Sequence, residues 1–158
     1  KTRDDTSGPF AFPANPYDLR GEFGRSDLDR RHRWVWMGML RLPWRMRSSS
    51  VVTLLSGVPF NVTTGRDDNR DSIVNDRPAG IGRNTGAGPS EANVDIRLSK
   101  EFTWPGERGR IEFAGDAFNL FNHFNPRSFV GVLRSPFYGR PNSALAARQV
   151  QCGIKLTF

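Results

Sequence analysis

The side chains best suited to bind an ion form an oxygen-rich run in the middle of the chain. Asp67, Asn69 and Asp71 place carboxylate or amide oxygens at alternate positions, as calcium loops do. An EF-hand loop beginning at Asp67 would need glycine at its sixth position and glutamate at its twelfth, where this sequence has Ser72 and Pro78. We therefore expect a solvated acidic turn, with a calcium site of another kind as the alternative.

No arrangement of side chains predicts catalysis. His32 and His123 are the only imidazoles, and neither HExxH nor another paired-histidine spacing accompanies them. The phosphate loop, the dinucleotide fingerprint and the nucleophile elbow do not occur. A single thiol, Cys152, excludes an intramolecular disulfide and a cysteine-based metal site. We expect no enzyme activity and no cofactor.

Arginine dominates the charge of the chain. The net charge is +7, and only three of the 23 basic residues are lysine. Two clusters stand out: Arg30, Arg31 and Arg33, and then Arg41, Arg45 and Arg47. Such clusters suit the phosphates of nucleic acid, or those of lipid and lipopolysaccharide. Solvated charge without a partner is the third interpretation.

The element that must position the end of the chain is a strand over residues 148–158. Apolar residues alternate there with polar ones, at Val150, Cys152, Ile154, Leu156 and Phe158. A tilted strand of about 9–11 residues crosses a bilayer, with apolar side chains toward lipid. The terminal aromatic residue resembles the C-terminal signature that the barrel-assembly machinery reads in outer-membrane proteins. An ordinary sandwich strand also alternates, so this strand alone leaves both possibilities open.

Four more segments have the composition or alternation of strands. They are residues 32–42, 47–56, 94–102 and 110–119. The segments between them are rich in glycine, proline, asparagine and aspartate, and we expect long loops over residues 1–31, 58–93 and 120–147.

The lengths of the connections alternate along the chain. Short turns at 43–46 and 104–109 each precede a long loop. Outer-membrane barrels have short periplasmic turns and long extracellular loops, whereas a sandwich has no reason to sort its loops in this way. The sequence therefore predicts an all-β fold: an antiparallel segment of a transmembrane β-barrel in the outer membrane.

In this barrel the tryptophans and one arginine cluster would lie near the membrane surfaces. Tryptophan favours the membrane interface, so an aromatic girdle is expected from Trp34, Trp36, Trp44 and Trp104, with core packing of a soluble protein as the alternative. The rim that faces lipopolysaccharide would be formed by Arg30, Arg31 and Arg33.

Six stretches, in order, resemble the C-terminal end of a TonB-dependent outer-membrane receptor of the Oar-like kind, which carries a carboxypeptidase-regulatory-like domain upstream. They are residues 27–33, 56–62, 75–78, 95–100, 118–123 and 148–158. The resemblance implies a plugged barrel of about 22 strands, of which this chain supplies the last five. It also implies a plug and a TonB box upstream, and a transported ligand of unknown nature bound partly by the loops 58–93 and 120–147.

The leading interpretation is thus a wall segment of a receptor for active uptake. Its expected partners are the lipid bilayer, lipopolysaccharide, the barrel-assembly machinery and, through upstream regions, TonB, but not nucleic acid. Because the chain begins Lys1-Thr2-Arg3 without a signal peptide, we expect a fragment. A soluble, basic all-β domain that binds nucleic acid is the alternative. A small complete barrel would need at least eight strands.

Overall fold

The computed structural model describes residues 2–6, 11–104 and 109–158. The chain divides into two compact units. The first, here called the sheet unit, comprises residues 34–54, 92–125 and 146–158. The second, the loop unit, comprises residues 1–33, 55–91 and 126–145. In the described part of the chain, no helix is long and apolar enough to cross a membrane.

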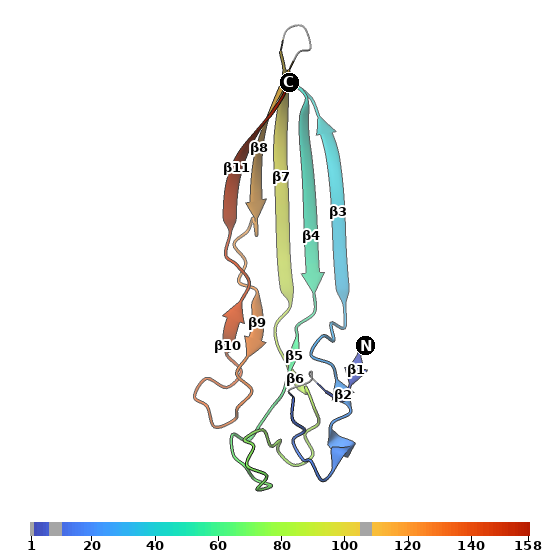
Figure 1. Cartoon of the computed structure of the whole chain (residues 1–158), viewed down its shortest axis with the longest axis vertical. Helices are drawn as coiled ribbons and strands as arrows, with labels where there is room; N and C mark the ends of the chain where they lie inside the picture. Colours follow the sequence, from blue (N-terminus) through green and yellow to red (C-terminus); the bar gives the residue numbers. More distant parts are fainter. Residues whose placement is uncertain (1, 7–10, 105–108) are drawn as a thin grey trace. The chain divides into compact units, whose positions relative to one another are not determined.

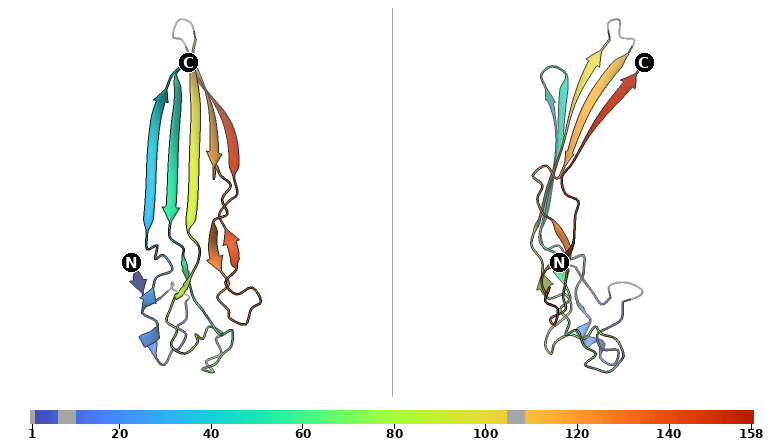
Figure 2. Two further views of the ribbon diagram at one scale, coloured as in Figure 1. Left: turned by 180° about the vertical axis from the view of Figure 1, so that it is seen from behind. Right: turned by 90° about the vertical axis from the view of Figure 1, so that its left-hand side faces the viewer.

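The sheet unit is a five-stranded sheet in the order β11-β8-β7-β4-β3 (Figure 1). Its strands are β3 (Arg33–Leu42), β4 (Met46–Leu55), β7 (Glu91–Thr103), β8 (Arg110–Phe118) and β11 (Gln149–Thr157). Strands that follow one another along the chain are neighbours in the sheet, as in an up-and-down barrel wall. In the side view of Figure 2, the β3–β4 hairpin diverges from β7, β8 and β11 toward the turn end, so the sheet is curved.

The predicted all-β, antiparallel fold is confirmed. The five long strands lie where the alternation placed them, and the largest difference is that β7 begins at Glu91 instead of residue 94. The turn between β3 and β4 is tight, because Met46 N–H donates to the Pro43 carbonyl at 3.3 Å. Its two central residues, Trp44 and Arg45, both have positive φ, at 59° and 58°. Paired positive φ values are those of the type I′ turn, which matches the twist of a hairpin.

The strand register places like residues beside like across β7, β8 and β11. On one face, Ile96, Ala117 and Val150 form a row, and the third row beyond it on the same face joins Phe102, Ile111 and Leu156. The rows that alternate with those of this face are polar, and they include Arg97–Asp116–Gln151 and Glu101–Glu112–Lys155. Because side chains alternate across a strand, one face of this part of the sheet is apolar and the opposite face is polar.

The three segments expected as long loops also contain short strands, which the sequence interpretation missed. In the loop unit, β1 (Arg3–Asp4) pairs with β2 (Gly24–Arg25), β5 (Pro59–Phe60) with β6 (Gly86–Ala87), and β9 (Pro126–Phe129) with β10 (Pro141–Ala144). A 3₁₀ turn, η1, spans Leu19–Gly21. These strands are two to four residues long, and all but β1 contain proline or glycine, so their sequences show no alternation that would predict them.

The loop unit contains almost no apolar core. Among the described residues of this unit, the buried apolar side chains are all small: Ala14, Pro59, Val62 and Pro126. Polar and charged residues take their place, and those buried in this unit are Glu22, Ser26, Asp29, Asp76, Arg83, Asn84 and Glu91. The backbone packs closely as well, because a Cβ at Gly131 would overlap the carbonyl oxygen of Asn61. Hydrogen bonds, more than apolar burial, therefore hold the loop unit in shape.

Candidate functional site

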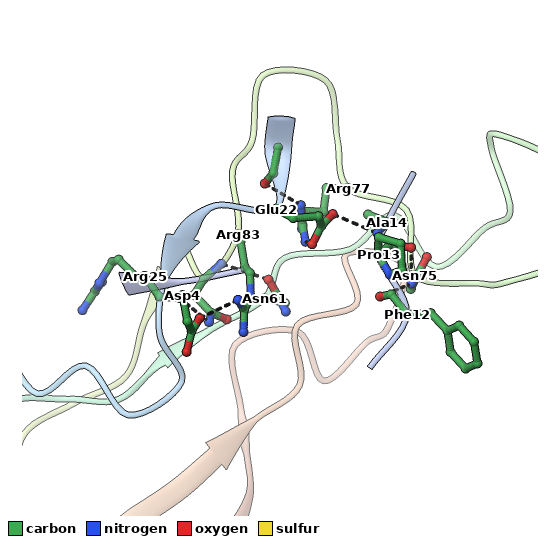
Figure 3. Close-up of polar contacts among 12 residues, drawn as sticks. Asp4, Phe12, Pro13, Ala14, Glu22, Arg25, Asn61, Asn75, Arg77 and Arg83 are labelled. Carbon is green, nitrogen blue, oxygen red and sulfur yellow. Dashed lines mark hydrogen bonds and ion pairs between the residues drawn. The ribbon is translucent and has the colours of Figure 1, made fainter. Parts of the chain in front are cut away.

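A buried arginine joins the first short strand to the segment before β6. The Arg83 side chain is 2% exposed, and its guanidinium bonds the carboxylate of Asp4 (Figure 3). The same guanidinium lies 3.8 Å from the carboxylate of Asp27. The next residue, Asn84, is fully buried and donates its side-chain amide to the Arg25 carbonyl at 2.7 Å. Its backbone N–H donates to Oδ1 of Asn61 at 2.9 Å.

A second buried ion pair closes the segment around η1. Glu22 accepts from the Ala14 N–H at 2.9 Å and from the Arg77 guanidinium at 2.6 Å (Figure 3). Arg77 also donates to the Gly21 carbonyl at 3.0 Å. The two side chains are only 10% and 9% exposed. Pairing and hydrogen bonding offset the cost of burying both charges, so this contact fixes residues 14–22 against residue 77.

These two networks border a cavity of about 810 Å³ in the loop unit. Its walls include the largely exposed side chains of Phe12, Leu19 and Phe23. Asn75 lies on the wall and donates to the carbonyls of Phe12 and Pro13, both at 3.1 Å (Figure 3). The buried Oδ1 of Asn75 has no hydrogen-bond partner in the described part of the chain. The cavity thus combines apolar side chains with many polar and charged ones, and a ligand with both kinds of surface would suit it.

Hydrogen bonding lowers the pKa of two carboxyl groups of the loop unit. Asp29 accepts from the Thr2 N–H at 2.9 Å and from Arg25 Nε at 3.0 Å, and these contacts hold its pKa below the usual value. The Arg20 side chain, followed by its backbone N–H, lowers the pKa of Asp18 to about 2. The same pairing raises the pKa of Arg20.

Ion pairs cover the polar face of the sheet unit. Arg97 lies 3.0 Å from Asp116 on the neighbouring strand. Glu101 and Glu112 are directly opposite each other, and Arg47 lies 3.3 Å from the first and 3.7 Å from the second. A cation between two opposed carboxylates relieves the repulsion that they would otherwise have. The polar face is therefore charged but locally neutralised, as suits a barrel interior in contact with water.

The residues of the proposed calcium loop bond to their own backbone. Oxygens of Asp67, Asn69 and Asp71 accept backbone N–H groups of residues 71, 72 and 73 at 2.8–3.0 Å. The bonds from Asn69 and Asp71, which reach two residues on, are those of Asx turns. The described residues contain no group of three or more histidines, cysteines, aspartates or glutamates that could hold a metal.

The two histidines lie in different units and bond to protein groups. His32 donates its backbone N–H to Ser56 Oγ at 3.0 Å, and His123 Nδ1 lies 2.9 Å from Asn125 Oδ1. Of the arginine cluster assigned to the rim, Arg30 bonds the Ser56 carbonyl and lies 3.0 Å from Glu91. Its neighbours Arg31 and Arg33 are exposed. Arg30 therefore makes contacts within the loop unit that stabilise it.

The second arginine cluster lies at the turn end of β3 and β4. Arg45 bonds Thr103, Arg47 lies between two carboxylates, and Arg41 is exposed. The four tryptophans expected in a girdle are all exposed, by 52%, 45%, 79% and 59% for Trp34, Trp36, Trp44 and Trp104. The residues of the expected assembly signal are exposed as well: Val150, Cys152, Ile154, Leu156 and Phe158. Their roles in the girdle and in assembly stay predictions.

The charged networks of the loop unit were not found from the sequence. Arg83 and Asp4 are 79 residues apart, and Arg77 and Glu22 are 55 apart. No local spacing signals a pair at such a separation. The only available hint was the frequency of charged residues in segments expected to be loops.

Comparison with known proteins agrees with the one-sided apolar character of the sheet. Residues 79–151 match the family model described as "Outer membrane beta barrel domain". No curated protein and no solved structure matches the chain. The match covers β7, β8 and the start of β11, and it gives no support to nucleic-acid binding. The one-sided apolar sheet and this similarity together show that the sheet unit is a segment of a transmembrane β-barrel in the outer membrane.

Proposed function

We propose that this chain is the C-terminal part of the barrel of a TonB-dependent, Oar-like receptor, and that it takes part in active uptake of a substrate across the outer membrane. Six stretches resembling that family, in its order, support the proposal. The match to an outer-membrane barrel domain supports the more general part of the proposal, that the chain belongs to a barrel of the outer membrane. In this receptor the sheet unit is part of the barrel wall, and its polar face lines the interior of the barrel.

The observation that carries the uptake role is the braced cavity of the loop unit. A wall that only seals the membrane needs no such cavity, and plain surface loops would not need a buried Glu22–Arg77 pair and a buried Arg83 to shape them. The long connections of an outer-membrane barrel are extracellular, so a cavity in them meets ligands from the medium. We propose that the cavity beside Asn75 contributes to binding the transported ligand.

The remaining partners follow from the same proposal. Lipopolysaccharide phosphates would meet the exposed Arg31 and Arg33, and the barrel-assembly machinery would read the C-terminal strand. TonB would act through a box upstream of the barrel. The chain itself is proposed to carry out no covalent chemistry and to need no cofactor.

Binding to TonB tests the proposal. The full-length protein, purified from outer membranes in detergent, would be titrated with the purified periplasmic domain of TonB. We expect a saturable complex, and we expect deletion of the receptor gene and deletion of the TonB gene to cause the same growth defect on one nutrient of a panel. A barrel protein that does not bind TonB, and whose deletion shares no growth defect with the TonB deletion, would refute the uptake role.

A further inference from the structure

One lysine interrupts the apolar face of the sheet unit. The register places Lys100 in a row with Phe113 and Ile154, between the row of Leu98 and the row of Phe102. This face of the sheet is toward lipid, where charged side chains are costly and rare. The position therefore requires either an escape to the membrane interface or a counter-ion.

The Lys100 side chain extends toward the short-turn end of the strand. Its Nζ lies 5.0 Å from the centre of the Phe102 ring, two residues nearer that end. Phe102 in turn meets Phe113 edge to face, with ring centres 5.8 Å apart. From Lys100 to Trp104 the strand covers only about 13 Å, at roughly 3.3 Å per residue. The ammonium thus snorkels toward the interface, held over an aromatic ring.

The described residues of β7, β8 and β11 place no carboxylate beside Lys100 on this face. The carboxylates of β7 and β8 at Glu101, Glu112 and Asp116 all belong to polar rows on the opposite face. Lys155 shows the contrast, because it lies directly opposite Glu112. In the described part of the chain Lys100 has no ion pair, so an anionic headgroup of the bilayer can serve as its counter-ion.

An apolar groove lies beside the ammonium. It has a volume of about 380 Å³, and the residues of the apolar face that line it are Leu98, Lys100, Phe113, Gly115, Cys152 and Ile154. Gly115 provides the depth, since a Cβ built there would meet nothing within 4 Å. A hydrocarbon chain can lie in such a groove and bury apolar surface on both sides.

We propose that Lys100 and this groove form a site for one anionic phospholipid. The phosphate pairs with the ammonium, and an acyl chain lies over Gly115. Short turns of outer-membrane barrels are periplasmic, so the site opens to the inner leaflet, which contains phospholipid and not lipopolysaccharide. The site is independent of TonB, since it rests only on the lipid-facing sheet.

Native mass spectrometry of retained lipid tests the site. The full-length protein would be reconstituted in nanodiscs of phosphatidylcholine and phosphatidylglycerol in equal parts, released into detergent and weighed with its bound lipids. We expect the wild type to retain phosphatidylglycerol selectively. Lys100→Gln should lower that selectivity about fivefold, the factor for one lysine near a membrane surface, and Lys100→Arg should keep it.

Two further variants separate the headgroup from the groove. Lys155→Gln removes the same charge from the polar face and should retain lipid as the wild type does. Gly115→Val fills the groove and should reduce retention of both lipids without changing the preference between them. Unchanged selectivity in Lys100→Gln, or equal loss in Lys155→Gln, would overturn the proposal. So would a wild type that retains lipopolysaccharide or a second protein in place of phosphatidylglycerol.

Discussion

At the scale of single residues, the loop unit depends on charges that are buried in pairs. Glu22 and Arg77 are the clearest pair, because each is about nine-tenths buried and each bonds the backbone or is bonded by it. Removing one partner leaves the other charged and without compensation. A pair of this kind fixes the path of the chain, and breaking it causes a large loss of stability.

Arg77→Met should therefore destabilise the loop unit by about 3–5 kcal/mol, the usual cost of breaking a buried pair. The Ala14 amide, which donates to Glu22, reports the loss directly, so its hydrogen exchange in the full-length protein should accelerate. Adding Glu22→Gln should restore part of the protection, since no charge is then left buried. Arg20→Ala, which removes an exposed pair with Asp18, is the control and should change little. Equal effects of the two arginine variants would contradict the assignment.

Acid should loosen the N-terminal strand pair through Asp29. The folded-state pKa of this carboxyl is lowered, so its contribution to stability is full above the unfolded value of about 3.9. That contribution is lost as the pH falls through the folded-state pKa. The protection factor of the Thr2 amide should stay constant from about pH 7 to pH 5 and decline below about pH 4. In Asp29→Asn this decline should be absent, and a pH-dependent variant would refute the role of Asp29.

At the scale of elements, β11 tests which face meets lipid. Ile154 pairs with Phe113 on the apolar face, and Gly153 pairs with Ala114 on the polar face. Ile154→Arg should cost about 2–4 kcal/mol if the residue lies near the midplane. Gly153→Arg adds the same charge where a Cβ meets nothing within 4 Å, and should be tolerated. Urea unfolding of the full-length protein in lipid vesicles would measure the stability of both variants. If Gly153→Arg were the more destabilising of the two, the assignment of the lipid-facing and interior faces would be reversed.

The last residue offers a separate test of assembly. Phe158 is fully exposed and lies beyond the hydrogen-bonded end of β11 at Thr157, so its loss removes no contact within the sheet. Deleting Phe158 should leave stability nearly unchanged but lower the amount of protein in the outer membrane. Phe158→Tyr, which keeps an aromatic ring, should restore that amount. Surface levels that do not respond to the deletion would argue against a role as an assembly signal.

Alternation and β-branched composition predicted the long strands of the sheet but not the short strands of the loops, and the reason is physical. A long strand with one face in lipid must repeat every second residue, and 148–158 shows this repeat in its sequence. The short strands β5 and β6 are two residues long and lie far apart in the sequence, so neither can carry a repeat. The sequence did not predict the cavity and its ion pairs, because the fold brings together residues that lie far apart in the sequence. The segments that contain these residues have the composition of polar loops.

At the scale of the whole molecule, the sheet has two open sides. β3 and β11 are the outer strands of the five, and each has one side without a strand partner in the described part of the chain. A closed barrel removes such edges, and bacterial barrels have at least eight strands. In a closed barrel, the neighbours of β3 and β11 would be strands other than these five.

The 158-residue chain expressed alone should consequently not remain a soluble monomer. Two unpaired edges and an apolar face designed for lipid give it three surfaces that favour association. Light scattering after size exclusion should show aggregates in buffer and smaller particles in detergent, because detergent covers the face but leaves the edges open. Full-length protein in the same detergent should be monodisperse, since its edges are closed. A chain that stays monomeric in buffer without detergent would mean that both faces of the sheet are covered by protein, and the transmembrane assignment of the sheet unit would fail with it.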